Sequence, residues 1–137
     1  ICYSAEEEEV ISRLARVGFE NIVGYTHGIE EWQSGGKDLD YIHSVDPSKI
    51  FNDDIKYLDV RKNNELDLGF VPESTHIPLH NLSNNLSKIN KDEDYLVYCA
   101  GGYRSMIACS ILKSNGYHNV KNIYGGFNLL AQHINNF

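Results

Sequence analysis

The stretch Asp94-Tyr-Leu-Val-Tyr-Cys99-Ala-Gly-Gly-Tyr-Arg104-Ser105 decides the fold of this chain. Its first half, residues 94–99, is a short apolar run, which is typical of a parallel strand that is buried on both faces. Two glycines follow, and residues 104–115 then show an amphipathic helical pattern that stops at Gly116. The residues of this helix that we expect to face the core are Met106, Ile107, Ile111 and Leu112.

The segments on either side alternate between strand and helix patterns. We predict strands at residues 55–60, 74–77 and 120–124, and helices at residues 63–68, 79–89 and 126–134. Alternating strands and helices predict an α/β fold with a mainly parallel central sheet flanked by helices. In such open sheets, functional sites form at the carboxyl ends of the strands.

Cys99 ends the most apolar of these strands, and this position makes it the candidate nucleophile. Glycines in the following turn let successive backbone N–H groups converge on one point, and the next helix directs its positive end there. Both effects stabilise a thiolate, and Arg104 adds a positive charge at the rim. The alternative is an inert buried cysteine beside a helix start, which leaves the Gly-Gly and Arg-Ser pairs unexplained. The predicted binding residues of the loop are Ala100, Gly101, Gly102, Tyr103 and Ser105.

The chain contains an internal repeat. Residues 10–32 match residues 108–130 at an offset of 98 residues without a gap, and apolar positions such as Leu14 and Leu112 agree in phase. Each copy has the pattern of a helix, a glycine stop, a short strand and a glycine that opens another helix. Besides Leu14 and Leu112, the identical pairs are Ser12 with Ser110, Gly18 with Gly116, Asn21 with Asn119, and Gly28 with Gly126.

This repeat predicts the domain organisation. Residues 108–130 are expected to be the last helix–strand–helix unit of a C-terminal domain that spans residues 46–137. Residues 1–45 are then expected to hold the same unit of a preceding, related domain whose front half is absent, followed by a linker. The linker is predicted to start at Gly35 and to run to Asp46 and Pro47.

The second domain resembles the rhodanese family in three stretches and in its last segment. They are Tyr57-Leu-Asp59-Val-Arg61, Gly69-Phe-Val-Pro-Glu-Ser-Thr-His-Ile77-Pro78, Tyr98-Cys99-Ala-Gly-Gly-Tyr-Arg104-Ser105, and Gly116-Tyr with Tyr124-Gly-Gly126-Phe. This resemblance spans residues 50–133 and implies a rhodanese-like fold. It also implies that a sulfane sulfur is transferred as a persulfide of Cys99, held by the loop amides. Asp59 and Arg61 are implied to sit near the loop and to support it.

The match to the family is incomplete, and the loop length bears on the reaction. Phe70 stands where the family usually has histidine, and Glu73-Ser74 where it usually has Gly-Ala. Cysteine phosphatases need five residues between cysteine and arginine to wrap a phosphoryl group. Four residues separate Cys99 from Arg104, so the shorter loop favours sulfur transfer over phosphate ester hydrolysis.

The first 32 residues carry a resemblance of their own. Residues 6–25 with Gly28-Ile-Glu-Glu-Trp32 look like the end of the first rhodanese repeat in fusions with a metallo-β-lactamase-fold domain, similar to persulfide dioxygenase–sulfurtransferases. That resemblance implies a possible upstream domain with a non-haem iron site in the same polypeptide. The first repeat is expected to be inactive, because Cys2-Tyr-Ser-Ala-Glu6 holds neither the glycine pair nor the arginine. We interpret Cys2 as a strand residue and Trp32 as a packing residue.

Composition and charge exclude several classes of function. The net charge of −7 argues against nucleic acid as the main partner, and no apolar run approaches the roughly 20 residues that span a membrane. Three scattered cysteines without CxxC spacing suggest a reducing, cytoplasmic setting and no structural zinc. Cys109 is interpreted as a core residue. The six histidines lack metal-ligand spacing, so we expect no metal and no cofactor within this chain.

The sequence therefore predicts a rhodanese-type sulfurtransferase. Cys99 would take sulfur from thiosulfate or a low-molecular-weight persulfide and pass it to a thiol or sulfite, with Arg104 attracting anionic donors. The alternative is a non-catalytic interaction or regulatory module within a larger sulfide-metabolising protein. The expected partners are small-molecule donors and thiol acceptors.

Overall fold

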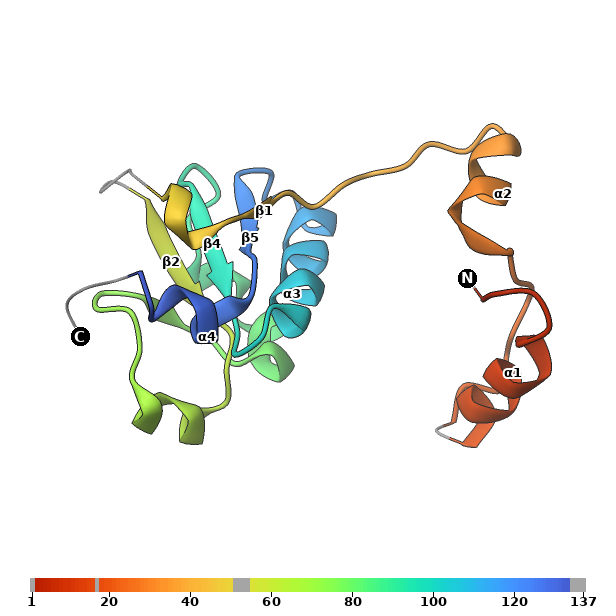
Figure 1. Cartoon of the computed structure of the whole chain (residues 1–137), viewed down its shortest axis with the longest axis horizontal. Helices are drawn as coiled ribbons and strands as arrows, with labels where there is room; N and C mark the ends of the chain where they lie inside the picture. Colours follow the sequence, from red (N-terminus) through yellow and green to blue (C-terminus); the bar gives the residue numbers. More distant parts are fainter. Residues whose placement is uncertain (1, 17, 51–54, 134–137) are drawn as a thin grey trace. The chain divides into compact units, whose positions relative to one another are not determined.

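The computed structural model describes residues 2–16, 18–50 and 55–133, and the chain divides into two compact units (Figure 1). The first unit is Ile1–Tyr41 and the second is Ile42–Phe137. This division lies four residues before the boundary expected between residues 45 and 46.

The second unit is built on a parallel sheet. Within its described residues five strands lie in the order β1-β5-β4-β2-β3, and every neighbouring pair is parallel. The predicted α/β class with a parallel central sheet is thereby confirmed. The strands are β1 (Ser44–Val45), β2 (Lys56–Asp59), β3 (Thr75–His76), β4 (Tyr95–Tyr98) and β5 (Val120–Ile123).

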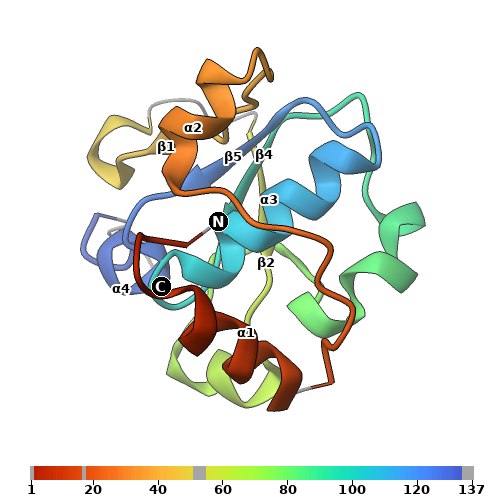
Figure 2. The same ribbon diagram turned by 90° about the vertical axis from the view of Figure 1, so that its right-hand side faces the viewer.

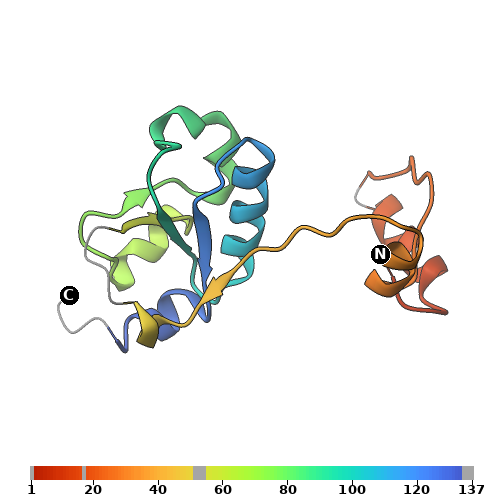
Figure 3. The ribbon, with the colours of Figure 1, turned by 90° about the horizontal axis from the view of Figure 1, so that it is seen from above.

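Helices cover both faces of the sheet, as Figure 3 shows. Alternate residues of β4 point to opposite faces, so Val97 joins a core beneath helix α3 (Tyr103–Ser114), whereas Leu96 joins a core beneath helix α4 (Gly126–Leu130). Both faces of β4 are fully buried, and this explains its continuous apolar sequence. Cys99 comes directly after β4 and belongs to the α3 side.

The predicted linker is wrong at its end, because residues 44 and 45 form the edge strand β1. Ser44 pairs with Asn122 and Val45 with Ile123 in parallel register. The run is only two residues long and is flanked by polar residues, so it carries no recognisable strand pattern. The 3-10 helix η1 (Pro47–Lys49) follows, started by Asp46, whose carboxylate accepts a hydrogen bond from the Ser48 amide.

Three helix predictions need correction. Residues 79–89 form two 3-10 helices, η3 (Leu79–Asn84) and η4 (Leu86–Lys88), because asparagine and serine side chains there compete for backbone groups. The Asn85 side chain, for example, donates to the Asn81 carbonyl. In α3, Met106 and Ile107 are exposed, since Ser105, Ala108, Cys109 and Leu112 form the buried stripe. The helix predicted at residues 63–68 is the 3-10 helix η2 (Asn63–Leu68). The helix predicted at residues 126–134 ends at Leu130, and residue 134 lies outside the described residues.

The first unit holds two helices joined by an extended segment, which Figure 2 shows in red and orange. Helix α1 (Glu7–Arg16) ends before Gly18, and helix α2 (Gly28–Ser34) begins at Gly28; both glycines have positive φ. Cys2 and His27 form an isolated parallel bridge. No residue of either helix is buried.

Candidate active site

Cys99 lies in a closed loop between β4 and α3, and its side chain is 1% exposed. The Gly102 amide donates a hydrogen bond to the Cys99 Sγ atom at 3.1 Å, and the Ser105 hydroxyl oxygen lies 3.5 Å from the same sulfur. The loop therefore folds back so that its own polar hydrogens surround the sulfur. This is the arrangement that the glycine-containing turn predicted.

Two glycines give the loop its shape. Gly102 caps α3 with a φ of 99°, a left-handed conformation that side chains disfavour. Gly126, at the start of α4, has no room for a side chain, because a Cβ atom there would lie 2.4 Å from the Cys99 carbonyl oxygen. This close approach lets the Phe127 amide donate to the Cys99 carbonyl at 2.6 Å and the Asn128 amide to the Ala100 carbonyl at 3.0 Å. The first turn of helix α4 thus holds the backbone of the loop through these two hydrogen bonds.

The surroundings of Cys99 favour its thiolate. Burial acts to raise the pKa of the Cys99 thiol, but hydrogen bonds from the Ser105 hydroxyl and from the amides of Ser105, Gly102 and Gly101 outweigh it. The pKa of Cys99 is therefore lowered. Cys109 lacks such donors, and burial raises its pKa to about 12. It packs in the core as a small apolar residue, as the sequence predicted.

A buried chain of polar side chains runs from the sulfur to the edge of the sheet. The Ser105 hydroxyl lies 2.6 Å from the Asn122 Oδ1 atom, and the Asn122 side-chain amide donates to the Ser44 hydroxyl at 2.9 Å. Ser105 and Asn122 are both buried. Ser105 was predicted to bind substrate, and the structure places it beneath the sulfur. Its single proton can serve Cys99, Gly102 or Asn122 at one time.

Arg104 does not stand free at the rim of the loop. Both of its terminal nitrogens donate to the Glu65 carboxylate, at 2.6 and 2.7 Å, in a bidentate ion pair. The hydrogen bonds from Arg104 lower the pKa of Glu65 to about 2. The two side chains are 30% and 21% exposed, so water screens this pair only in part.

Asp59 and Arg61 form a second ion pair that is fully buried. The Asp59 carboxylate receives the Arg61 Nε and Nη2 hydrogens at 2.6–3.0 Å. Arg61 also donates to the Gly69 carbonyl and to the Glu65 carbonyl, and it lies 4.1 Å above the centre of the Phe127 ring. This ion pair therefore supports the loop indirectly, because Arg61 contacts Glu65 and Phe127, which in turn contact Arg104 and Cys99.

Two hollows open beside the loop. One, of about 390 Å³, is lined by Lys62, Asn64, Glu65 and Arg104, and is charged. The other, of about 450 Å³, holds two exposed tyrosines, Tyr103 and Tyr124. The described residues that line this second hollow are Ser44, Gly101, Gly102, Tyr103, Met106, Asn122, Tyr124 and Gly125. Of the predicted loop residues, Gly101, Gly102 and Tyr103 line the second hollow, Ser105 is buried, and Ala100 is partly exposed.

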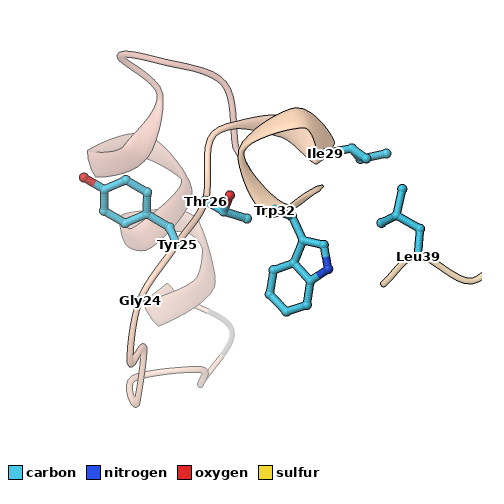
Figure 4. A pocket seen from close by; sticks show the side chains of 6 residues that line it. All are labelled: Gly24, Tyr25, Thr26, Ile29, Trp32 and Leu39. Carbon is cyan, nitrogen blue, oxygen red and sulfur yellow. The ribbon is translucent and has the colours of Figure 1, made fainter. Parts of the chain in front are cut away.

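A third hollow, of about 610 Å³, lies within the first unit. Figure 4 shows Ile29, Trp32 and Leu39 around this space, with Tyr25 pointing away from them. Its described lining is mainly apolar and contains no cysteine, histidine or acidic side chain. At the offset of 98 residues, Ile29 and Trp32 correspond to Phe127 and Leu130, which are packed in the second unit. This hollow therefore corresponds to a region that is packed core in the second unit.

Metal-ligand clusters, membrane-spanning helices and disulfides are all absent from the described residues. Among residues 2–16, 18–50 and 55–133, no group of three or more histidine, cysteine or acidic side chains could ligate a metal ion. Within the same residues, no helix has the length and apolar character needed to cross a membrane. The cysteines at positions 2, 99 and 109 are all free thiols.

Sequence reasoning missed three residues that shape the loop of Cys99 or its rim: Glu65, Asn122 and Gly126. Glu65 lies 39 positions before Arg104, and no local pattern links the two. Asn122 gave a usable signal, because a polar residue within an apolar strand usually has a buried hydrogen-bond partner. Gly126 does start a helix, as predicted, but no sequence pattern indicated that a side chain there would meet the Cys99 carbonyl oxygen.

The fold and the site together define a class of protein. It is a parallel α/β domain in which a buried cysteine, at the end of a central strand, is surrounded by the amides of a loop that leads into a helix. The sequence model of the rhodanese-like domain family matches residues 48–133, and the chain belongs to that family.

Known proteins of this kind resemble the second unit. A sulfurtransferase of Allochromatium vinosum is 36% identical over 81 residues, which cover 59% of this chain and 76% of that protein. The putative sulfurtransferase YtwF of Bacillus subtilis is 35% identical over 79 residues, covering 57% and 76%. The crystal structure of a rhodanese-related protein from Thermoplasma volcanium matches with a TM-score of 0.62 and 28% identity. That match covers 67% of this chain and 93% of that one.

Proposed function

We propose that this chain is a rhodanese-type sulfurtransferase that carries sulfane sulfur on Cys99. The observation that carries the proposal is the Cys99 sulfur itself, which is buried, accepts the Gly102 amide at 3.1 Å and has a lowered pKa. The sulfurtransferase names of the two bacterial relatives support the same reaction class.

The first half-reaction loads the enzyme. The Cys99 thiolate attacks the outer sulfur of the donor and forms a new S–S bond, while the donor's own bond to that sulfur breaks. The electron pair of the broken bond leaves with sulfite if the donor is thiosulfate, or with a thiolate if it is a persulfide. The loop amides of residues 100–104 and the N-terminal end of α3 then hold the charge of the Cys99 persulfide.

The second half-reaction empties the enzyme. The sulfur of a thiol or sulfite acceptor attacks the terminal sulfur of the persulfide and breaks its bond to Cys99. The electron pair returns to Cys99 as thiolate, which the same hydrogen bonds stabilise. Donor and acceptor therefore use one site in turn, and no cofactor is required for either step.

The proposal extends to the setting of the domain. A thiolate carrier needs a reduced cysteine, so we place the reaction in a reducing, cytoplasmic environment, in keeping with the three free thiols. We also propose, from the resemblance of residues 6–32, that the domain serves a larger sulfide-metabolising polypeptide with a metallo-β-lactamase-fold domain.

The test is the intact mass of the protein after incubation with thiosulfate and, separately, with glutathione persulfide. Wild type should gain one sulfur, about 32 Da, which cyanide or excess thiol removes. The Cys99→Ser variant should gain none, and Cys109→Ser should behave like wild type because Cys109 is buried without donors.

Other outcomes separate the alternatives. No mass gain with either donor, while Cys99 remains reduced, would contradict the proposal and favour the non-catalytic interaction module. Hydrolysis of a phosphate ester in place of sulfur transfer would instead indicate a cysteine phosphatase, despite the four-residue spacing between Cys99 and Arg104.

A further inference from the structure

The cation at the rim of the loop is already neutralised. Arg104 directs both terminal nitrogens to Glu65, so the pair presents little net charge to a donor that approaches Cys99. The sequence alone predicted a free arginine that would attract anions. Lys62 also lines the adjoining hollow, but it is exposed and its charge is screened by water.

Glu65 is fixed from several directions, so it cannot easily turn away when a donor arrives. Its carboxylate accepts the Lys62 amide at 2.9 Å, and its own amide donates to the Lys62 carbonyl at 3.0 Å. Its carbonyl accepts a hydrogen bond from Arg61, which is buried against Asp59. The carboxylate is therefore a fixed negative charge beside the loop.

Such a charge affects the two classes of donor differently. Thiosulfate places two negative charges close to its transferring sulfur, and its reaction releases sulfite, which is also a dianion. A protonated persulfide, R–S–S–H, carries no charge on its two sulfurs. Its reaction with the Cys99 thiolate gives a protonated Cys99 persulfide and one thiolate. A carboxylate that cancels Arg104 therefore opposes the first donor much more than the second.

We infer that Glu65 is a specificity-determining residue that neutralises Arg104, so that the site favours low-molecular-weight persulfides over thiosulfate. This inference rests on the proposed function and refines its donor. Glu65 sets the charge that a donor meets, without taking part in bond making or breaking.

The chain offers a matched control for the test. Glu65→Gln removes one negative charge from η2, and Asp67→Asn removes the same charge two residues away on an exposed position of the same helix. Glu65→Asp keeps the charge. For each variant, kcat/KM is measured with thiosulfate and with glutathione persulfide, at low and high ionic strength, after circular dichroism has shown that the variant folds.

Glu65→Gln should raise kcat/KM for thiosulfate about tenfold and change that for the persulfide less than about twofold. The gain should shrink with added salt, because it is electrostatic. Asp67→Asn should leave the ratio of the two donors unchanged, and Glu65→Asp should stay close to wild type. A second readout needs no turnover: sulfite should protect Cys99 from iodoacetamide at about tenfold lower concentration in Glu65→Gln.

Three results would overturn the inference. The first is an equal loss with both donors in Glu65→Gln, since that would make Glu65 a support of the loop only. The second is an equal gain in Asp67→Asn, which would assign the effect to general surface charge. The third is sulfite protection that is unchanged by Glu65→Gln. A wild type that accepts sulfur from neither donor would contradict the proposed function, whereas the sulfite measurement would still decide the inference.

Discussion

The two copies of the repeated unit have the same local geometry and opposite surroundings. At the offset of 98 residues, Cys2 and His27 correspond to Ala100 and Gly125, so their isolated bridge is not equivalent to any of the residue pairs between β4 and β5. The corresponding glycines do agree, since Gly18 and Gly116 have φ values of 90° and 84°, and Gly28 and Gly126 have values of 75° and 58°. This agreement supports the proposal that residues 1–41 hold a degenerate copy of the rhodanese-like unit.

Burial separates the two copies. In the second unit, Ile123, Phe127 and Leu130 are buried against residues contributed by β4 and by the segment before it, such as Leu96 and Val71. Their counterparts in the first unit, Tyr25, Ile29 and Trp32, are between 43% and 58% exposed. The comparison teaches that the turns are encoded locally, whereas burial depends on packing partners from distant segments.

The largest expected difference between the copies concerns the glycine that opens the last helix. Gly126→Ala would place a Cβ atom against the carbonyl oxygens of Cys99 and Ala100. It should cost roughly 3–5 kcal/mol of stability, because these oxygens belong to the backbone and cannot move aside. Gly28→Ala meets only the flexible Glu30 side chain and should cost about 1 kcal/mol. Urea unfolding of both variants checks this. Equal losses would show that the two turns are under the same constraint.

A smaller difference is expected for the leucines that correspond in the two helices. Leu112 is fully buried, and Leu112→Ala should destabilise the second unit by roughly 2–4 kcal/mol through the cavity it leaves. Leu14 is 36% exposed, so Leu14→Ala should cost less than about 1 kcal/mol. Amide hydrogen exchange in α3 and in α1 reports each loss separately. Comparable acceleration in both helices would mean that Leu14 is buried in solution.

The smallest expected effect concerns acid. The folded pKa of Glu65 is about 2, below its ordinary 4.5, so its stabilisation is complete above pH 4.5 and is lost as the pH falls towards 2. We expect a loss of about 1 kcal/mol in the second unit, allowing for partial exposure of the pair. In the first unit, Glu7 has a lowered pKa through a hydrogen bond of its own backbone and through His27.

Two variants sharpen this acid comparison. Glu65→Gln should reduce the acid-dependent loss in the second unit, because the carboxylate paired with Arg104 is gone. Asp46, whose pKa is lowered by hydrogen bonds from Ser48, keeps its own contribution. Asp67→Asn should retain the full loss. Urea midpoints of the second unit at about pH 6 and about pH 3 measure the change. If both variants lose stability like wild type, the acid response arises elsewhere than at Arg104.

Much of the fold could be predicted because its patterns are local. The apolar run that became β4, the amphipathic residues that became α3, and Gly116 each act within a few positions, so their physics is visible in sequence. The position of Cys99 at the end of β4 follows from the same reasoning. Even the repeat was visible, since matching turns require matching glycines.

The rest depends on contacts between distant segments. Two-residue strands such as β1 have too few residues to show a period, and their pairing is decided by β5. The charge at the rim depends on Glu65 and Arg104 meeting across the fold, which spacing cannot reveal. Likewise, Met106 and Ile107 have core-like side chains, yet the position of the sheet turns them outward.

The strand β1 also has a consequence for the site. It is the place where the chain coming from the first unit enters the sheet, held there by Asn122, whose amide donates to the His43 carbonyl at 2.8 Å. Ser44 accepts the side chain of the same asparagine, which in turn contacts Ser105 beneath the sulfur. Asn122 therefore joins the edge strand to the floor of the site, and it lies two hydrogen bonds away from the Cys99 sulfur.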